Sequence, residues 1–65
     1  MTADFDGIKL RIPNGYVETD VSGCYMNGHG VEYALVKYGQ EPDAAYCLET
    51  IYSKHIRQVW LEKVN

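Results

Sequence analysis

Four residues of the kinds that bind metal ions or act as nucleophiles are scattered along this sequence: Cys24, His29, Cys47 and His55. Two cysteines and two histidines form the ligand set of many tetrahedral zinc sites. Such sites usually hold two ligands at short spacing, as in Cys-x2-Cys, and no such pair occurs here. A Cys–His nucleophile would also need a third, orienting group, which the local sequence does not provide. We therefore expect no metal, no cofactor and no enzymatic activity.

Two further patterns could suggest a phosphate-binding loop or an acid–base pair, but neither predicts such a site here. Gly28-His29-Gly30 has the glycines of a phosphate-binding loop, but neither the lysine nor the spacing that such loops use. Acidic residues stand two apart at Asp4/Asp6, Glu18/Asp20 and Glu41/Asp43. Alternate residues of a strand share one side, so Glu18 and Asp20 are expected to project together into solvent and not to act as an acid–base pair.

Charge along the chain favours a basic partner. The 65 residues have a formal net charge of −3, with eight acidic against three basic residues in positions 1–53. Positions 54–65 reverse this, with Lys54, Arg57 and Lys63 against Glu62. Domains that bind nucleic acid usually carry a basic surface, so direct nucleic-acid binding is disfavoured.

The N-terminal residues 1–6 hold two acids and no long apolar segment, unlike a secretory signal. No apolar run elsewhere is long enough to cross a membrane as a helix. Two cysteines are too few for the disulfide framework of a small secreted domain. These features predict one domain, residues 1–65, in the cytoplasm, with two free thiols.

The first part of the chain has the pattern of an antiparallel β-meander. Apolar and polar residues alternate in the predicted strands, which cover about residues 8–12, 16–26 and 31–38. Asn14-Gly15 and Asn27-Gly28 separate them, and Asn-Gly is a strong signal for a tight hairpin turn.

Within the second predicted strand, alternation assigns a face to each side chain. Val17, Thr19 and Val21 are expected to face the core, with Glu18 and Asp20 on the solvent side. Ser22-Gly23 interrupts the pattern and predicts a bulge inside this strand.

The last third of the sequence changes its period. Apolar residues recur three or four positions apart at Ala45, Leu48, Tyr52, Ile56 and Val59. This spacing is typical of an amphipathic helix, and Asp43 stands where an N-cap would be. The predicted fold is therefore α+β: a three-stranded antiparallel meander with one C-terminal α-helix, residues 43–63, packed on one face.

A second interpretation of the same segment remains open. Tyr46-Cys47-Leu48 and Gln58-Val59-Trp60-Leu61 could form two further short strands, which would give a five-stranded, SH3-like β-barrel.

Six tyrosines are the unusual feature of the composition. A domain this small can fully bury only a few such rings, and exposed tyrosines beside acids are typical anchors for a protein partner. We predict a partner-binding surface on the meander made of Tyr16, Glu18, Asp20, Glu32 and Tyr38.

One stretch of the chain contains Gly15-Tyr16-Val17, Gly23-Cys24, Gly28 and Glu32-Tyr33-Ala34-Leu35. This stretch, residues 15–35 and about a third of the chain, resembles the conserved stretch of HicB-type antitoxins. The interval before Gly23-Cys24 is shorter than in that family, and its Pro-Asp-Leu-Pro motif is missing. The resemblance implies a helix at residues 32–38 and a regulator that binds a toxin.

Size, acidity and the lack of catalytic groups together predict a non-enzymatic protein-binding module. We expect an inhibitor that occludes a basic, nucleic-acid-binding surface of a larger protein. Phage-encoded inhibitors of host defence, including anti-CRISPR proteins, are similar to this chain in these general properties. The alternatives are an antitoxin-like regulator and a small barrel that binds nucleic acid through the basic C-terminal segment.

Overall fold

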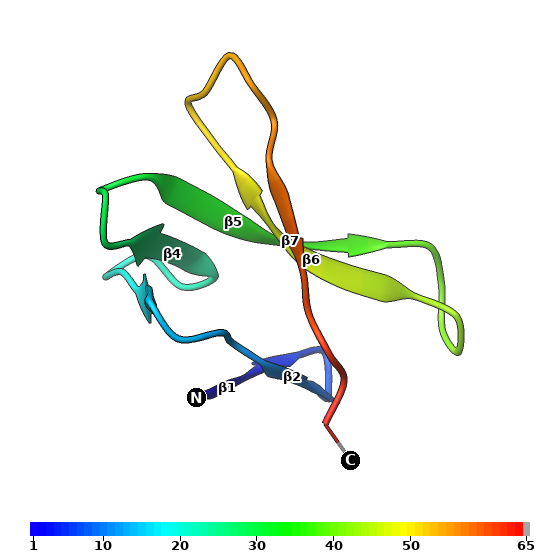
Figure 1. The fold of residues 1–65 in the computed structure, drawn as a ribbon. Helices are drawn as coiled ribbons and strands as arrows, with labels where there is room; N and C mark the ends of the chain where they lie inside the picture. The colour runs from blue at the N-terminus through cyan, green and yellow to red at the C-terminus, as the bar shows by residue number, and fades with distance from the viewer. Residues whose placement is uncertain (65) are drawn as a thin grey trace.

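The chain is built from β-strands. A computed structural model describes residues 1–64, and these residues form no helix. Seven strands follow one another in the order β1 (Thr2–Phe5), β2 (Ile8–Arg11), β3 (Tyr16–Glu18), β4 (Cys24–Asn27), β5 (Glu32–Tyr38), β6 (Ala45–Thr50) and β7 (Gln58–Trp60). They make a two-stranded hairpin and a five-stranded antiparallel sheet (Figure 1).

The hairpin joins β1 to β2 through a two-residue turn. Asp6 and Gly7 both have positive φ angles, 50° and 86°, which is the backbone of a type I′ turn. This turn matches the twist of the flanking strands and sets the register that pairs Phe5 with Ile8. Asp-Gly is a hairpin signal in the sequence, and at Asp6-Gly7 it indicates a strand before residue 8.

The larger sheet is a meander with the order β3-β4-β5-β6-β7, in which every neighbouring pair is antiparallel. The turn between β4 and β5 is held by Asn27, whose Oδ1 accepts hydrogen bonds from the backbone N–H groups of His29 and Val31 at 2.9 and 3.0 Å. The β6–β7 loop rises at the top of Figure 1.

The residues after β7 connect the sheet to the hairpin. Leu61 N–H still donates to the Tyr46 carbonyl, but Arg11 N–H donates to the Glu62 carbonyl and Val64 N–H to the Lys9 carbonyl, at 2.8 to 2.9 Å. Lys63 thus pairs with Leu10 of β2. Among the described residues the pairing runs from β3 to β7, through this segment, to β2 and β1. β1 and β3 are not paired with each other, so the sheet does not close into a barrel.

The core lies between the hairpin and one face of the five-stranded sheet. One cluster contains Ile12, Tyr25, Tyr33 and Leu48, and a second contains Leu10, Ala44 and Tyr46. Two edge-to-face ring pairs add to this packing: Tyr16 with Tyr33 at 5.2 Å, and Phe5 with Tyr46 at 5.3 Å.

The predicted α+β fold is wrong, because the segment 43–63 contains no helix. Leu48 and Val59 do face the core, but as cross-strand partners in β6 and β7. Tyr52 and Ile56, which the helical spacing put on the same stripe, lie in the β6–β7 loop and are 92% and 70% exposed.

The alternative interpretation as a closed SH3-like barrel is also wrong, although its two additional strands overlap β6 and β7. The helix that the antitoxin resemblance implies is contradicted by β5, which occupies residues 32–38 as a strand.

The single strand predicted over residues 16–26 is in fact two strands, β3 and β4, which pair with each other across the turn between them. Ser22-Gly23 belongs to that turn and is not a bulge. Val17 and Val21 are therefore 67% and 57% exposed, and neither faces the core. Asn14-Gly15 forms a turn as predicted, but β2 and β3 on either side of it do not pair.

Candidate protein-binding face

The five-stranded sheet has one face covered by the hairpin and one face without a covering element among residues 1–64. Because side chains alternate along a strand, the register decides which residues occupy the second face. We call it the open face; its principal side chains are Val17, Met26, Glu32, Val36, Tyr38, Glu49, Gln58 and Trp60. Both core clusters lie on the opposite side of the sheet.

Four side chains of the open face contact one another. The Tyr38 hydroxyl donates a hydrogen bond to Glu49 Oε1, and Gln58 Nε2 donates to the same oxygen at 2.9 Å and to the Tyr38 oxygen at 3.1 Å. The ring of Trp60 lies against that of Tyr38, with centroids 5.6 Å apart and planes inclined by 58°. We call Tyr38, Glu49, Gln58 and Trp60 the aromatic cluster.

These hydrogen bonds shift the pKa values of both acidic groups in the aromatic cluster. The bond from Tyr38, followed by that from Gln58, lowers the pKa of Glu49, because both stabilise its carboxylate. The same carboxylate raises the pKa of Tyr38, since it accepts a hydrogen bond from the neutral hydroxyl and repels a phenolate. Near neutral pH the cluster therefore holds an ionised Glu49 and a neutral Tyr38.

The aromatic cluster exposes its rings even though its polar atoms are satisfied. Tyr38 is 41% exposed and Trp60 is 53% exposed. Cys47, the register partner of both Val36 and Trp60, is fully buried on this same face. Burial raises the pKa of the Cys47 thiol, so this cysteine is a packing residue and not an activated nucleophile.

The structure separates the five residues predicted to bind a partner. Tyr38 and Glu32 lie on the open face, on β5. Tyr16 and Glu18 lie on the opposite side of β3, where Tyr16 packs on Tyr33, while Asp20 is in the β3–β4 turn. The expected common face of Glu18 and Asp20 is not formed, because the strand ends between them.

Glu49, Gln58 and Trp60 were not predicted as site residues, because the predicted helix covered residues 43–63. A usable signal was present: Gln58-Val59-Trp60 alternates, and β-branched and aromatic residues favour strands. Read as a strand, this segment places Gln58 and Trp60 together on one face, opposite Val59.

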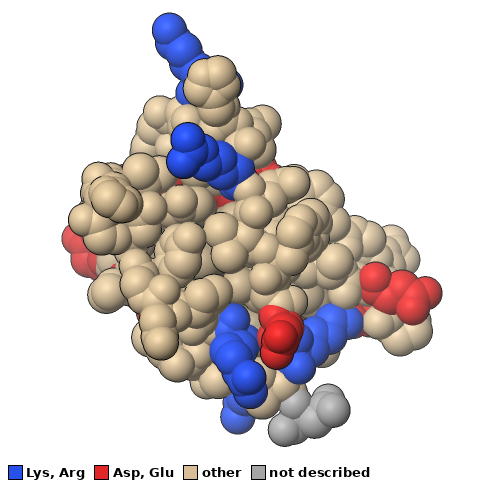
Figure 2. Space-filling model, viewed as in Figure 1, with Lys and Arg blue, Asp and Glu red and all other residues tan. Residues whose placement is uncertain are grey.

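Basic side chains gather over the β6–β7 loop. Figure 2 shows them at the top of the molecule, above a broad uncharged surface, and shows a second group of basic and acidic side chains at the lower end. The basic residues of this loop are Lys54 and Arg57, and both are exposed. The loop is ordered by Thr50, whose Oγ1 accepts from Arg57 N–H at 2.9 Å and donates to the His55 carbonyl at 3.2 Å.

The four possible metal ligands lie on different elements. Cys24 is on β4, Cys47 on β6, His29 in the β4–β5 turn and His55 in the β6–β7 loop. Within residues 1–64, no three histidine, cysteine or acidic side chains are arranged so that they could hold a metal ion.

A helix that could span a membrane would have to be long and apolar, and none occurs in the part of the chain that the structure describes.

Comparison with other proteins does not assign the chain to a family. No protein-family model, no curated protein and no solved structure matches this chain.

Proposed function

We propose that this chain is a non-enzymatic protein-binding module that covers part of a larger protein with its open face and thereby inhibits it. The observation that carries this proposal is the aromatic cluster. Tyr38 and Trp60 expose large ring surfaces, while Glu49 and Gln58 hold Tyr38 in one position. Tyrosine and tryptophan are the residues most enriched at the energetic centres of protein interfaces.

Preorganisation makes these rings effective anchors. A side chain that is already held by neighbours loses less conformational entropy when a partner binds. The ring contact and the shared hydrogen bonds at Glu49 restrict both Tyr38 and Trp60 before binding. Val36 and Met26 extend the same face with half-buried apolar side chains. The open face therefore has a preorganised apolar centre.

The charges on this face favour a basic partner. Glu32 and Glu49 are the only charged side chains that the register places on the open face of the described strands. The chain as a whole has a net charge of −3. A partner surface with an apolar pocket and a basic rim would complement it, and long-range attraction would speed the encounter. A surface that normally holds nucleic acid has this character, which supports an inhibitor of the phage anti-defence type.

The proposal can be tested with the full chain as bait in lysate of its source cells, followed by binding kinetics with the purified partner. Trp60→Ala should weaken binding at least about 30-fold, because truncating an interface anchor typically costs 2 kcal/mol or more. Glu32→Gln with Glu49→Gln should act mainly by slowing association.

Tyr52→Ala is the matched control, since Tyr52 is 92% exposed and lies off the open face. Its affinity should equal that of the unchanged chain. If Tyr52→Ala abolishes binding while Trp60→Ala does not, the interface lies at the β6–β7 loop and the proposed face is wrong.

A further inference from the structure

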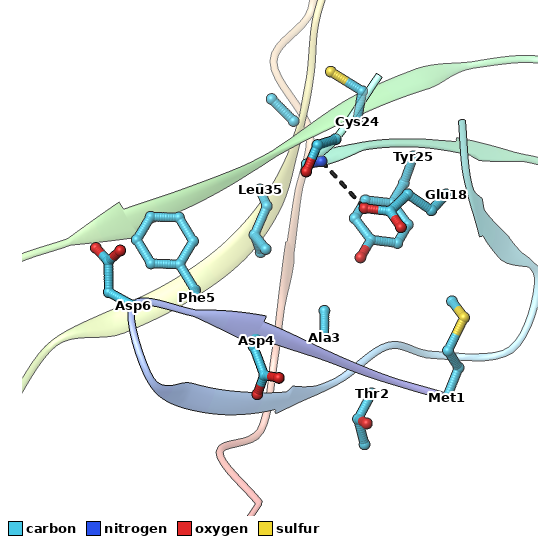
Figure 3. A pocket seen from close by; sticks show the side chains of 13 residues that line it. Met1, Thr2, Ala3, Asp4, Phe5, Asp6, Glu18, Cys24, Tyr25 and Leu35 are labelled. Carbon is cyan, nitrogen blue, oxygen red and sulfur yellow. Dashed lines mark hydrogen bonds between the residues drawn. The ribbon is translucent and has the colours of Figure 1, made fainter. Parts of the chain in front are cut away.

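A groove runs along β1 at the place where the sheet fails to close. Its volume is about 660 Å³. Residues 1–6 line it on one side, and Glu18 of β3 with residues of the β3–β4 turn, β4 and β5 lines it on the other (Figure 3). No residue of β2 contributes, so the groove lies along the edge of β1 that faces away from its hairpin partner.

This edge of β1 has free backbone groups. In the hairpin, Ile12 N–H donates to the Met1 carbonyl, and the two-residue turn makes Phe5 and Ile8 a hydrogen-bonded pair. Hydrogen-bonded and non-hydrogen-bonded pairs alternate in an antiparallel ladder. The backbone N–H and C=O groups of Thr2 and Asp4 therefore point outward, and within residues 1–64 no other backbone group binds them.

The walls of the groove combine apolar surface with negative charge. Phe5, Leu35 and Tyr25 supply the apolar part, as Figure 3 shows. Among residues 1–64, the acidic residues that line the groove are Asp4, Asp6 and Glu18, and no lysine or arginine lines it. One Glu18 oxygen accepts a hydrogen bond from Gly23 N–H at 3.2 Å, which places this carboxylate at the wall opposite β1.

We propose that this groove binds an extended, basic segment of a partner protein, which adds to β1 as a further strand. An unpaired strand edge is a template for strand addition, in which main-chain hydrogen bonds give affinity and side-chain pockets give specificity. A strand rises about 3.4 Å per residue, so β1 and its flanking residues match a segment of about five or six residues. The carboxylates select lysine or arginine in that segment. This site is separate from the open face and does not depend on it.

The test uses random nonapeptides displayed on phage, selected on the immobilised full chain. We expect the enriched peptides to carry more lysine and arginine than the starting library. In ¹⁵N NMR spectra, a synthetic copy of an enriched peptide should shift the amide signals of Thr2 and Asp4 and slow their hydrogen exchange.

Two substitutions at one position isolate the backbone contact. Asp4→Pro and Asp4→Ala both remove the charge, but only proline removes the outward N–H, and proline is tolerated at such edge positions. The selected peptide should bind Asp4→Pro about tenfold more weakly than Asp4→Ala, because one main-chain hydrogen bond is lost. If Asp4→Pro does not fold, the backbone contact is tested on the peptide instead. Two versions of the peptide are made, one N-methylated at its odd-numbered and one at its even-numbered backbone nitrogens. The version that loses the N–H groups facing β1 should not bind, and the other should still bind.

A second pair of substitutions tests the charge. Glu18→Gln keeps an acceptor for Gly23, and Asp6→Asn keeps a residue suited to the type I′ turn. Together they should weaken the affinity for the basic peptide about threefold to tenfold.

The proposal is overturned if no peptide is enriched, if enriched peptides are neutral or acidic, or if they shift signals of residues 58–60 but not those of Thr2 and Asp4. Shifts of Thr2 and Asp4 that grow with protein concentration alone would assign this edge to a second copy of the chain and would also overturn it.

Discussion

Trp60 stands directly opposite Cys47 in the register of β7 on β6, and Cys47 is fully buried although it is on the open face. Cross-strand partners have Cβ atoms about 5 Å apart, close enough for an indole ring to lie over the neighbouring side chain. We therefore expect Trp60 to shield the Cys47 thiol, while its exposed surface lies beside Tyr38.

This relationship predicts the reactivity of the two thiols. Cys24 is half-buried, whereas Cys47 is buried and its thiol pKa is raised by that burial. In the folded protein at pH 7.5, iodoacetamide should modify Cys24 at least about tenfold faster than Cys47, since the thiolate is the reacting form. Mass spectrometry of the digested protein measures both rates. Trp60→Ala should raise the rate at Cys47 selectively; equal rates in the unchanged protein would show that Cys47 is not covered.

The assignment of core and open face predicts how truncations affect stability. Leu48→Ala should lower the free energy of unfolding by about 2–4 kcal/mol, because Leu48 is fully buried. Val17→Ala should change it by less than about 0.5 kcal/mol, because Val17 is 67% exposed. Urea denaturation followed by circular dichroism gives both values. A large loss from Val17→Ala would mean that β3 presents the opposite face to the core.

The hairpin turn gives a prediction about backbone conformation. Gly7 has φ of 86°, and a Cβ atom added there would meet no atom within 4 Å. Gly7→Ala should therefore cost about 1–2 kcal/mol through the left-handed backbone alone. Gly28 is equally open but does not have a positive φ, so Gly28→Ala is the matched control and should be close to neutral. Similar losses from both substitutions would argue against the type I′ turn at Asp6-Gly7.

The lowered pKa values of two glutamates predict how stability depends on pH. Hydrogen bonds lower the pKa of Glu49, chiefly that from Tyr38, and that of Glu41, chiefly that from Lys63. A carboxylate whose folded pKa lies below the unfolded value stabilises the fold above the unfolded pKa. Both contributions should therefore be complete above about pH 5 and be lost as the pH falls below the ordinary value of 4.5 and through the lowered folded pKa values.

Urea titrations at pH 7, 5, 4 and 3 measure this dependence. Glu49→Gln should flatten the decline in acid, and Asp20→Asn, at an exposed turn residue, is the control that should leave the slope nearly unchanged. A decline that is as steep in Glu49→Gln with Glu41→Gln as in the unchanged chain would contradict the two hydrogen-bonded carboxylates.

Local patterns in the sequence predicted some strands correctly and failed where pairing decides the structure. The alternation of Ile8, Leu10 and Ile12 indicates a strand that faces the core, and Leu10 and Ile12 are indeed buried. In the last third, Leu48 and Val59 fit both a helical stripe and two paired strands. The local spacing does not distinguish these structures, because the difference lies in the pairing of β6 with β5, whose partners are from 7 residues (Tyr38 and Ala45) to 17 residues (Tyr33 and Thr50) apart in the chain.

The candidate site was predictable to the same limited extent. The unusual tyrosine content led to the prediction of Tyr38 as a partner-binding residue, and the alternation of residues 31–38 predicted that Glu32 lies on the surface of a sheet. Trp60 and Glu49 joined them only through the register of β6 with β5 and β7. Glu18 and Asp20 were grouped on the assumption of one continuous strand, which the turn through Ser22-Gly23 interrupts.

The most direct test of the proposed binding face uses Trp60, which is the only tryptophan in the chain. Replacing it with 5-fluorotryptophan gives this protein a single ¹⁹F NMR signal from the open face, whatever residues the partner contains. Because Trp60 is 53% exposed in the free chain, its signal should show a solvent isotope shift between H₂O and D₂O. In the saturated complex with the partner, the account predicts a moved signal that has lost this isotope shift. A signal with the same position and isotope shift in the complex would contradict the claim that the open face binds the partner.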